Sequence, residues 1–374
     1  MNMKKMNITI LDFDDIKNPL LGAGQAKATL EVGSRLAAKG HKVTVLCSKY
    51  PGYKDRKESG ITYRHIGFSS SNIKISNMLY ILSLPFSVRK IKADIIMECF
   101  TAPVTTLFSP LFTKIPVVAL STSFEAERFS KLYHFPFDKI EKRGLPHYKY
   151  FVALSDFYEE KMKKANPKVI STVIPEGVGE EFFKIKKSKP KHILFLGRLD
   201  IGQKGIDLLL EAYLKIASKS KYPLIIAGNG PDEKRVFELI QKMKLERKVS
   251  MVGPAYGAKK EKLLSESLFV AFPSRNETFS CFALEALASE LPLVAFNIPG
   301  IEWSGNKVAL KAPAFNVGKY SSLLLSSQNA KKMGALGKKA RKFASTFTWE
   351  SVTDEFEAFF QNVIKIERSN YASK

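Results

Sequence analysis

Short apolar segments alternate with longer segments of helical period along this chain, and the alternation occurs twice. The first series opens with 7–13, which reads as a buried strand, followed by a loop with Gly22 and Gly24, a helix, and a second strand at 42–47. The second series begins at His192 with the same order. Strands that alternate with helices form parallel sheets covered by helices on both faces. The sequence therefore predicts an α/β protein of two Rossmann-like, doubly wound domains facing across a cleft.

The length of 374 residues is sufficient for two such domains. A charged, proline-containing segment at 184–191 separates the two series and is typical of a linker. We predict a first domain at 1–183, a second domain at 184–345 and a separate C-terminal segment at 346–374.

The cysteines and histidines follow no disulfide or metal-binding pattern. Cys47, Cys99 and Cys281 are far apart without CxxC spacing, and the five histidines show no ligand spacing. The apolar stretch after the basic start ends at Asp12, too early for a signal peptide. The longest uncharged run, 99–113, contains two prolines and is shorter than the roughly 20 residues of a spanning helix. We expect a cytoplasmic protein without a resident metal.

The formal net charge of +23 indicates a polyanionic surface or substrate as partner. Nucleic-acid-binding proteins concentrate such charge in a tail or groove with stacking aromatics, whereas here it is spread evenly along the chain. We therefore expect no nucleic acid. Between 73 and 92, apolar residues alternate with Lys and Arg, so this stretch is interpreted as a helix that lies on an anionic membrane or as an ordinary surface helix.

In doubly wound sheets, ligands bind at the carboxyl ends of the strands, so the loops that follow the strands identify the candidate site. The loop after the strand 192–196 carries Arg198 and Lys204 on a glycine-rich turn before a helix. Arg can pair with a diphosphate as a fork and Lys as a point charge. This loop predicts a diphosphate site.

The loop after the strand 268–272 carries Glu277 and runs into a helix that holds Glu285. With the helix expected from about Thr278, the backbone N–H groups of 278–282 would be unpaired donors for phosphate oxygens. The two glutamates would lie about 12 Å apart along the helix. That separation fits a ligand with hydroxyls at both ends and phosphates between them, as in a nucleotide sugar.

An ordered set of motifs runs through nearly the whole chain: Val173-Ile174-Pro175 with Gly177-Val178, Gly197-Arg198-Leu199 with Lys204-Gly205, Gly228-x-Gly230-Pro231, Val252-Gly253, Glu277 with Glu285, and Phe347-Thr348-Trp349-Glu350. In this set the chain resembles glycosyltransferase family four, a group of retaining, nucleotide-sugar-dependent enzymes with the GT-B fold that generally need no metal.

The resemblance implies a role for each site residue. Arg198, Lys204 and Glu277 would be the catalytic groups, with the two cations on the donor diphosphate and Glu277 on the transferred sugar, while Glu285 would bind the ribose. The other implied donor-binding residues are Gly22, Gly24, Gly228, Gly230, Val252, Gly253, Thr278, Phe279, Ser280, Cys281 and Phe282. In the family's fold the last helix crosses back onto the first domain.

The sequence departs from the family pattern in three places. Members often carry a His after the fourth strand of the first domain, whereas here that strand leads into Ser121, Thr122 and Ser123, which become the acceptor-side candidates. A hydroxyl could replace the His, the departing diphosphate could act as base, or activity could be poor. Glu176 stands where the family prefers Asn, and Ser280 where it prefers Gly. Ser280 adds a side chain near the sugar, so the identity of the transferred sugar stays undetermined.

The segment Asp12-Phe13-Asp14 resembles the DxD motif by which other glycosyltransferases hold a metal, but it lies in the domain opposite the donor phosphates. We expect neither a metal nor a cofactor besides a UDP-sugar or GDP-sugar donor. The predicted function is retaining transfer of a hexosyl group to a hydroxyl of a lipid-linked or cell-envelope glycan, in the cytoplasm or peripherally on the inner membrane face. The alternatives are a non-catalytic GT-B binding protein and a nucleotide-sugar epimerase of the same fold.

Overall fold

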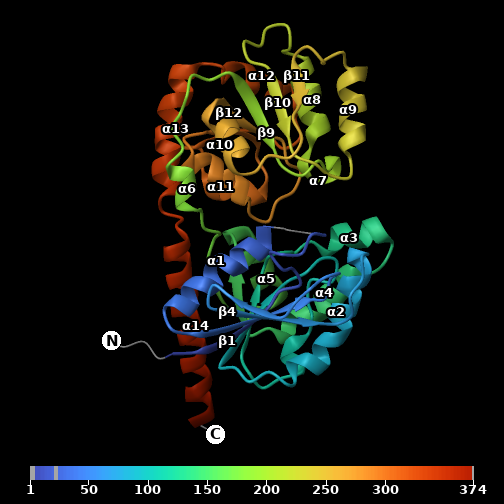
Figure 1. Cartoon of the computed structure of the whole chain (residues 1–374), viewed down its shortest axis with the longest axis vertical. Helices are drawn as coiled ribbons and strands as arrows, with labels where there is room; N and C mark the ends of the chain where they lie inside the picture. The colour runs from blue at the N-terminus through green and yellow to red at the C-terminus, as the bar shows by residue number, and fades with distance from the viewer. Residues whose placement is uncertain (1–4, 21–23, 373–374) are drawn as a thin grey trace. The chain divides into compact units, whose positions relative to one another are not determined.

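The computed structural model describes residues 5–20 and 24–372, and the chain divides into two compact α/β units. Unit 1 is Met1–Glu176 together with Trp349–Lys374, and unit 2 is Gly177–Thr348. Figure 1 shows strands surrounded by helices in each unit. The alternation in the sequence thus produces two Rossmann-like sheets.

Unit 1 has an eight-stranded sheet in the order β3-β4-β2-β1-β5-β6-β7-β8, parallel except for the β3–β4 pair. Its strands are β1 (Asn7–Leu11), β2 (Lys42–Ser48), β3 (Arg56–Glu58), β4 (Ile61–Ile66), β5 (Ile95–Cys99), β6 (Val117–Leu120), β7 (Tyr150–Ala153) and β8 (Ile170–Val173). Its α-helices are α1 (Gly24–Ala38), α2 (Ile73–Val88), α3 (Ala126–Tyr133), α4 (Phe137–Gly144), α5 (Asp156–Ala165) and α14 (Trp349–Ala372), with short 3₁₀ turns η1 (Ser109–Leu111) and η2 (Leu145–His147).

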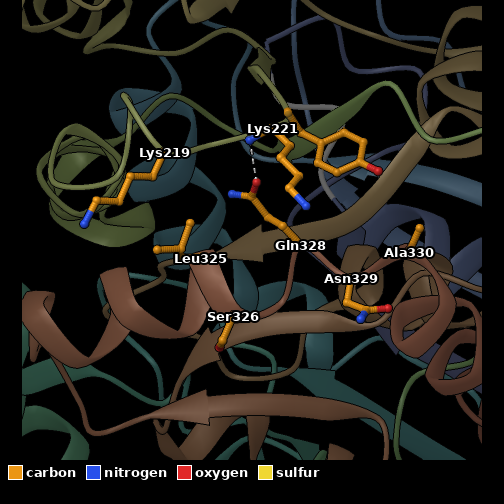
Figure 2. Close-up of a pocket in the computed structure, with 8 residues that line it drawn as sticks. Lys219, Lys221, Leu325, Ser326, Gln328, Asn329 and Ala330 are labelled. Atoms are coloured by element: carbon orange, nitrogen blue, oxygen red, sulfur yellow. Dashed lines mark hydrogen bonds between the residues drawn. The ribbon is translucent and has the colours of Figure 1, made fainter.

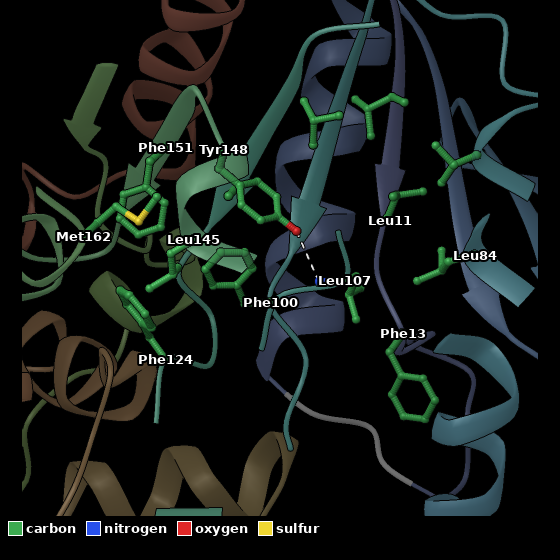
Figure 3. Close-up of a cluster of buried hydrophobic side chains, with 14 of the residues drawn as sticks. Leu11, Phe13, Leu84, Phe100, Leu107, Phe124, Leu145, Tyr148, Phe151 and Met162 are labelled. Atoms are coloured by element: carbon green, nitrogen blue, oxygen red, sulfur yellow. Dashed lines mark hydrogen bonds between the residues drawn. The ribbon is translucent and has the colours of Figure 1, made fainter. Parts of the chain in front are cut away.

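The strands β5, β6 and β7 are buried along their whole length, which explains why their sequences are apolar apart from Glu98 in β5. Beside them a cluster of aromatic side chains fills the core of unit 1, where the rings of Phe100 and Tyr148 lie 5.4 Å apart (Figure 3). Glu98 is fully buried in this core and accepts hydrogen bonds from the Tyr148 hydroxyl and the Leu107 amide. The loop after β5 is thereby held against the core.

Unit 2 has a six-stranded, fully parallel sheet in the order β11-β10-β9-β12-β13-β14. Its strands are β9 (His192–Leu196), β10 (Leu224–Ala227), β11 (Val249–Met251), β12 (Ser267–Phe272), β13 (Leu293–Phe296) and β14 (Ala309–Ala312). Its helices are α6 (Glu180–Phe183), α7 (Ile201–Lys204), α8 (Ile206–Leu214), α9 (Glu233–Lys242), α10 (Gly257–Ser265), α11 (Cys281–Ala288), α12 (Val317–Ser326), α13 (Ala330–Ala344) and the 3₁₀ helix η3 (Pro299–Ser304).

The C-terminal helix α14 belongs to unit 1, where it packs on α1. Its buried residues Val352, Phe356, Phe360 and Val363 recur every three or four positions and so form one apolar face. Near its middle, Glu357 accepts a hydrogen bond from Lys39 at 2.9 Å and lies 2.9 Å from His41 Nε2. The helix is thus fixed to unit 1 by an apolar face and by a buried polar contact.

The boundaries of the units differ from the predicted 183/184 and 345/346. Residues 177–183 already belong to unit 2, where Arg341 donates to the Phe183 carbonyl. The charged segment 184–191 is also part of unit 2, because the Ser188 and Lys191 amides donate to carbonyls at the end of α10 at 3.0 and 2.8 Å. Polar composition identified this segment as a linker, but backbone hydrogen bonds bind it to the unit.

Within the described residues, none of the helices combines the length and the apolar character that crossing a membrane requires.

Candidate functional site

The loop after β9 carries Arg198 and leads into α7. Asp200 caps this helix, since its side chain accepts a hydrogen bond from the Gln203 amide at 2.9 Å. Arg198 lies just before the cap, is exposed, and forms no ion pair with any residue that the structure describes. Its guanidinium is therefore available to an anionic ligand at the carboxyl end of β9.

Lys204, the last residue of α7, meets Glu277 from the loop after β12. The Lys204 ammonium Nζ lies 2.6 Å from Glu277 Oε1, and the Ser274 hydroxyl donates to the same oxygen at 2.7 Å. The Glu277 residue is 6% exposed. The structure thus brings two of the three predicted catalytic residues into direct contact, as a largely buried ion pair.

Arg275, which had no role in the sequence-based prediction, fastens the loop after β12 to the helices that follow β9. Its guanidinium donates to both carboxylate oxygens of Asp207 and to the Ile201 carbonyl, each at 2.7 Å. Gly205 between α7 and α8 has φ +63°, and a Cβ there would lie 2.1 Å from the Pro273 carbonyl oxygen. The backbone that positions Lys204 and the backbone that positions Glu277 are therefore in contact.

Gly228 and Gly230 allow the loop after β10 to pack closely on the loop after β9. A Cβ on Gly228 would lie 1.8 Å from the Gly197 carbonyl oxygen, and one on Gly230 would lie 2.5 Å from that of Leu199. Packing inside the unit therefore explains both glycines.

At Gly253, which follows Val252, φ is +68° and no atom of the described residues lies within 4 Å of a Cβ position, so there is open space beside this turn.

The helix α11 begins at Cys281, so the expectation that it starts at about Thr278 is wrong. The physical reason is Ser280, which adopts an extended conformation and whose hydroxyl accepts a hydrogen bond from the Ala283 amide at 3.2 Å. Residues 278–280 therefore form the turn before the helix, and one of the amides at the helix start is already used by the cap. Thr278, Phe279 and Ser280 remain at the mouth of α11, next to Glu277.

Glu285 on α11 is paired with Lys260 on α10. Lys260 Nζ lies 2.6 Å from Glu285 Oε2, and the two side chains are 20% and 11% exposed. The same ammonium lies 4.8 Å from the centre of the Phe182 ring. Sequence reasoning missed Lys260 because it stands among several lysines on α10 and only the sheet topology brings α10 next to α11.

An aromatic stack supports the turn that carries Glu277. The rings of Phe279 and Trp303 lie 4.6 Å apart and nearly parallel, at 23°. Gly300 in η3 approaches so closely that a Cβ there would lie 2.0 Å from the Glu277 carbonyl oxygen. Trp303 was not predicted, since neither its spacing nor its neighbours in the sequence indicate this contact.

The remaining candidates lie in unit 1. Gly22 lies outside the described residues, and Gly24 is the first residue of α1. Ser121 is fully buried and its hydroxyl accepts from the Leu154 amide at 3.0 Å, while the Thr122 hydroxyl donates to the Phe100 carbonyl. Ser123 is half-buried. Of the three hydroxyls at this strand end, those of Ser121 and Thr122 thus form hydrogen bonds to the backbone of unit 1.

Unit 1 also contains two buried carboxyl groups, Asp12 and Glu176, whose pKa values are raised. Burial raises the pKa of Asp12 to about 6, although the Thr29 hydroxyl donates a hydrogen bond to it. Burial, together with the nearby Asp12 carboxyl, raises the pKa of Glu176 to about 7. Glu176, Thr29 and Trp349 line a cavity of about 20 Å³, and the buried Trp349 Nε1 has no hydrogen-bond partner among the described residues.

A second polar cluster in unit 1 brings Asp15, Cys47 and His65 within 4.8 Å of one another. Arg56 already donates to both oxygens of Asp15 at 2.6 Å, and His65 Nε2 lies 2.9 Å from the same carboxylate. Burial opposes ionisation of Asp15, but the hydrogen bonds from Arg56 and His65 outweigh it and hold the pKa of Asp15 well below its usual range. The geometry is that of a closed ion-pair network, which a metal would have to disrupt. In the adjoining Asp12-Phe13-Asp14 turn, the Asp12 carboxylate accepts from the Asp14 amide at 3.1 Å.

A larger hollow of about 460 Å³ lies elsewhere on unit 2, beside the segment that precedes β10 (Figure 2). Gln328 closes one side of it by accepting a hydrogen bond from the Lys221 amide at 2.8 Å. Because this hollow lies at the amino end of its strand, it does not adjoin the loops that carry Arg198, Lys204 and Glu277.

Curated relatives match parts of this chain. An uncharacterised glycosyltransferase of Methanocaldococcus jannaschii is 36% identical over 30% of this chain and 28% of its own length. The N-acetylgalactosamine-N,N'-diacetylbacillosaminyl-diphospho-undecaprenol 4-alpha-N-acetylgalactosaminyltransferase of Campylobacter jejuni is 34% identical over 32% of this chain and 31% of its own length. The chain thus matches about a third of the length of these relatives.

Solved structures match almost the whole chain at low sequence identity. The sucrose-phosphate synthase of Thermosynechococcus elongatus has a TM-score of 0.77 at 17% identity, with 99% of this chain and 100% of that chain covered. The Anabaena protein HepE in complex with UDP has a TM-score of 0.73 at 15% identity, with 96% and 100% covered. These likenesses show the GT-B fold.

Two family models match overlapping parts of the chain. Residues 22–182 match the model described as Glycosyltransferase Family 4, and residues 178–303 match the model described as Glycosyl transferases group 1. The two matches follow each other across the boundary between the units, and the solved structures have the same fold. This chain therefore belongs to glycosyltransferase family four.

Proposed function

We propose that this protein is a retaining glycosyltransferase that moves a hexosyl group from a UDP-sugar or GDP-sugar to a hydroxyl. The observation that carries the proposal is the contact between two loops at the carboxyl ends of β9 and β12. Lys204 from the first loop and Ser274 from the second both bond to Glu277. The first loop also carries the exposed Arg198. Cations for a diphosphate and a carboxylate for sugar hydroxyls thus occur together where a doubly wound sheet binds ligands.

In the proposed reaction, the bond between the anomeric carbon and the leaving phosphate oxygen breaks. The acceptor oxygen bonds to the anomeric carbon on the same face of the sugar, and the acceptor proton passes to the departing diphosphate. Arg198 and Lys204 stabilise the negative charge that grows on this diphosphate. In the free protein Glu277 neutralises Lys204, so the donor would share that ammonium with Glu277. These cations supply the positive charge that a metal would otherwise provide, and we propose that transfer needs none.

Other parts of unit 2 would bind the ribose and the base of the donor. We assign Glu285 to the ribose hydroxyls, with Lys260 holding its carboxylate in place. The turn at Val252 and Gly253 offers open space to the base. HepE, a protein of the same fold, has been solved with UDP, which supports a uridine nucleotide as the first donor to test.

The acceptor is proposed from the relatives. The name of the Campylobacter jejuni relative describes transfer to a diphospho-undecaprenol-linked saccharide. We propose a lipid-linked or cell-envelope glycan as acceptor, used at the inner face of the membrane.

The test is a thermal-shift screen of UDP, GDP and their sugars, followed by nucleotide release with an acceptor extract in the presence of EDTA. Arg198→Ala and Lys204→Ala should each lower the release rate by about 100-fold or more, since removal of one charge-stabilising donor costs about that much. Lys234→Ala is the matched control, because Lys234 is a 90% exposed lysine of the same unit. An unchanged transfer rate in both site variants would refute the assignment. Retention is tested by the anomeric configuration of the product, which should be the same as that of the donor.

A non-catalytic binding protein of the same fold is the second candidate. It is favoured by the strand end at 121–123, where the expected His is absent and the Ser121 and Thr122 hydroxyls are engaged in the fold. Such a protein would bind UDP or GDP in the thermal-shift screen but release no nucleotide with any acceptor extract.

A further inference from the structure

The helix α2 turns an apolar face to solvent. Ile75, Met78, Leu82 and Phe86 are 44%, 54%, 60% and 66% exposed, and their spacing of three and four residues places them along one side of the helix. Large apolar side chains scattered singly over a surface are ordinary, but a continuous row of them marks an interaction site.

The orientation of α2 is fixed by its other face. Tyr80, Leu84 and Val88 are fully buried in the core of unit 1, and the Tyr80 hydroxyl donates to the Leu46 carbonyl at 3.2 Å. Asn77, next to the exposed Met78, is buried and donates to the Ala102 carbonyl at 2.5 Å. The helix therefore cannot rotate its apolar row inward without losing these contacts.

Neighbouring elements extend this row at the start of α2. Lys74 lies over the Tyr133 ring at 5.0 Å from its centre, which joins α2 to the end of α3. There Leu132 and Phe135 are 59% and 51% exposed. In Figure 1, α2, α3 and α4 lie on the same side of unit 1. We call the set of Ile75, Met78, Leu82, Phe86, Leu132, Tyr133 and Phe135 the α2 apolar surface.

The charges along α2 itself have one sign. No Asp or Glu occurs between residues 59 and 93. Within this stretch, exposed basic residues stand at both ends of α2: Lys74 at its start, and Arg89, Lys90 and Lys92 just after it. Apolar side chains flanked by Lys and Arg suit a surface that is apolar inside and anionic at its boundary, as a phospholipid bilayer is.

We propose that the α2 apolar surface docks on an anionic phospholipid bilayer, with α2 lying along the interface. The apolar row enters the boundary between headgroups and acyl chains, and the four flanking cations contact lipid phosphates. The biological purpose rests on the proposed function, because docking would bring unit 1 to an acceptor carried on a lipid. The binding itself is independent of sugar transfer.

The experiment is co-sedimentation of the full chain with vesicles of phosphatidylcholine containing phosphatidylglycerol, compared with vesicles of phosphatidylcholine alone. The protein should bind the anionic vesicles and not the neutral ones, and binding should weaken as salt rises. Leu82→Glu with Phe86→Glu should weaken binding at least tenfold, and so should Lys90→Glu with Lys92→Glu. These residues are exposed, so the variants should keep the circular dichroism spectrum of the parent.

Phe237→Glu is the matched control, since Phe237 is a 52% exposed aromatic residue on α9 of unit 2 and should leave vesicle binding unchanged. Equal binding to both kinds of vesicle, or unchanged binding of the Leu82→Glu, Phe86→Glu variant, would overturn the proposal. A parent protein that ignores vesicles but dimerises through this surface would overturn it in favour of a second copy of the chain. Nucleotide release with a water-soluble acceptor, measured on the same variants, should not change, which separates failure of docking from failure of the proposed function.

Discussion

The buried Glu176 carboxyl makes the stability of unit 1 depend on pH in a direction that can be worked out. Its pKa is raised from 4.5 to about 7 by burial and by the Asp12 carboxyl. The folded protein therefore binds this proton more tightly than the unfolded chain does. The stabilisation is fully present below about pH 4.5, is lost as pH rises toward about 7, and is absent above that value.

The perturbation is Glu176→Gln, which keeps the shape of the side chain and removes its charge. A shift of this size corresponds to a few kcal/mol at about 1.4 kcal/mol per pKa unit. We expect Glu176→Gln to raise the free energy of unfolding by on the order of 2 kcal/mol at pH 8 and to leave it nearly unchanged at pH 4.5. Asp12, whose pKa is raised to about 6, retains a smaller dependence of the same sign in the variant.

The assay is denaturant unfolding at a series of pH values, followed by tryptophan fluorescence. The chain has two tryptophans, so a Trp303→Phe background leaves Trp349, which lines the same cavity as Glu176, as the reporter of unit 1. Glu127→Gln is the control, because Glu127 is an exposed carboxylate of the same unit. Equal effects of Glu176→Gln at both ends of the pH range, or a loss of stability at pH 8, would refute the reasoning.

Two further predictions concern unit 2. Gly205→Ala places a Cβ 2.1 Å from a backbone carbonyl at φ +63°, so we expect a loss of at least about 1 kcal/mol of stability together with weaker UDP binding, measured by thermal unfolding with and without UDP. Lys260→Ala removes the ion pair with the 11% exposed Glu285 side chain, so the free energy of unfolding of unit 2, measured with denaturant, should fall by roughly 1 to 3 kcal/mol. Lys262→Ala, at an exposed position on the same helix, should leave it unchanged, and equal losses in the two lysine variants would contradict the assignment.

The sequence predicted the parts of this molecule that depend on local periodicity. The strand at 192–196 and the alternation around it are visible because a strand buried on both faces must be apolar throughout. Lys204 and Glu277 could be assigned to one site because their loops follow strands of the same sheet, and the structure has them in contact.

Features that depend on packing between distant segments could not be predicted in this way. The pairing of Lys260 with Glu285 and the stack of Trp303 on Phe279 join residues about 25 positions apart, and no local pattern encodes them. The start of α11 was misplaced because Ser280 was judged as a departure from the family rather than as a helix cap. On α2, the composition showed apolar residues but not which of them would face solvent.

The assignment of α14 to unit 1 has a consequence for how the chain folds. Unit 2 is one continuous segment, Gly177–Thr348, whereas unit 1 is assembled from segments on both sides of it. During synthesis from the N-terminus, the larger part of unit 1 leaves the ribosome without the apolar face of Val352, Phe356 and Phe360 that covers it. Unit 2 can therefore fold as soon as its own segment has been synthesised, whereas unit 1 is completed only when α14 has been added.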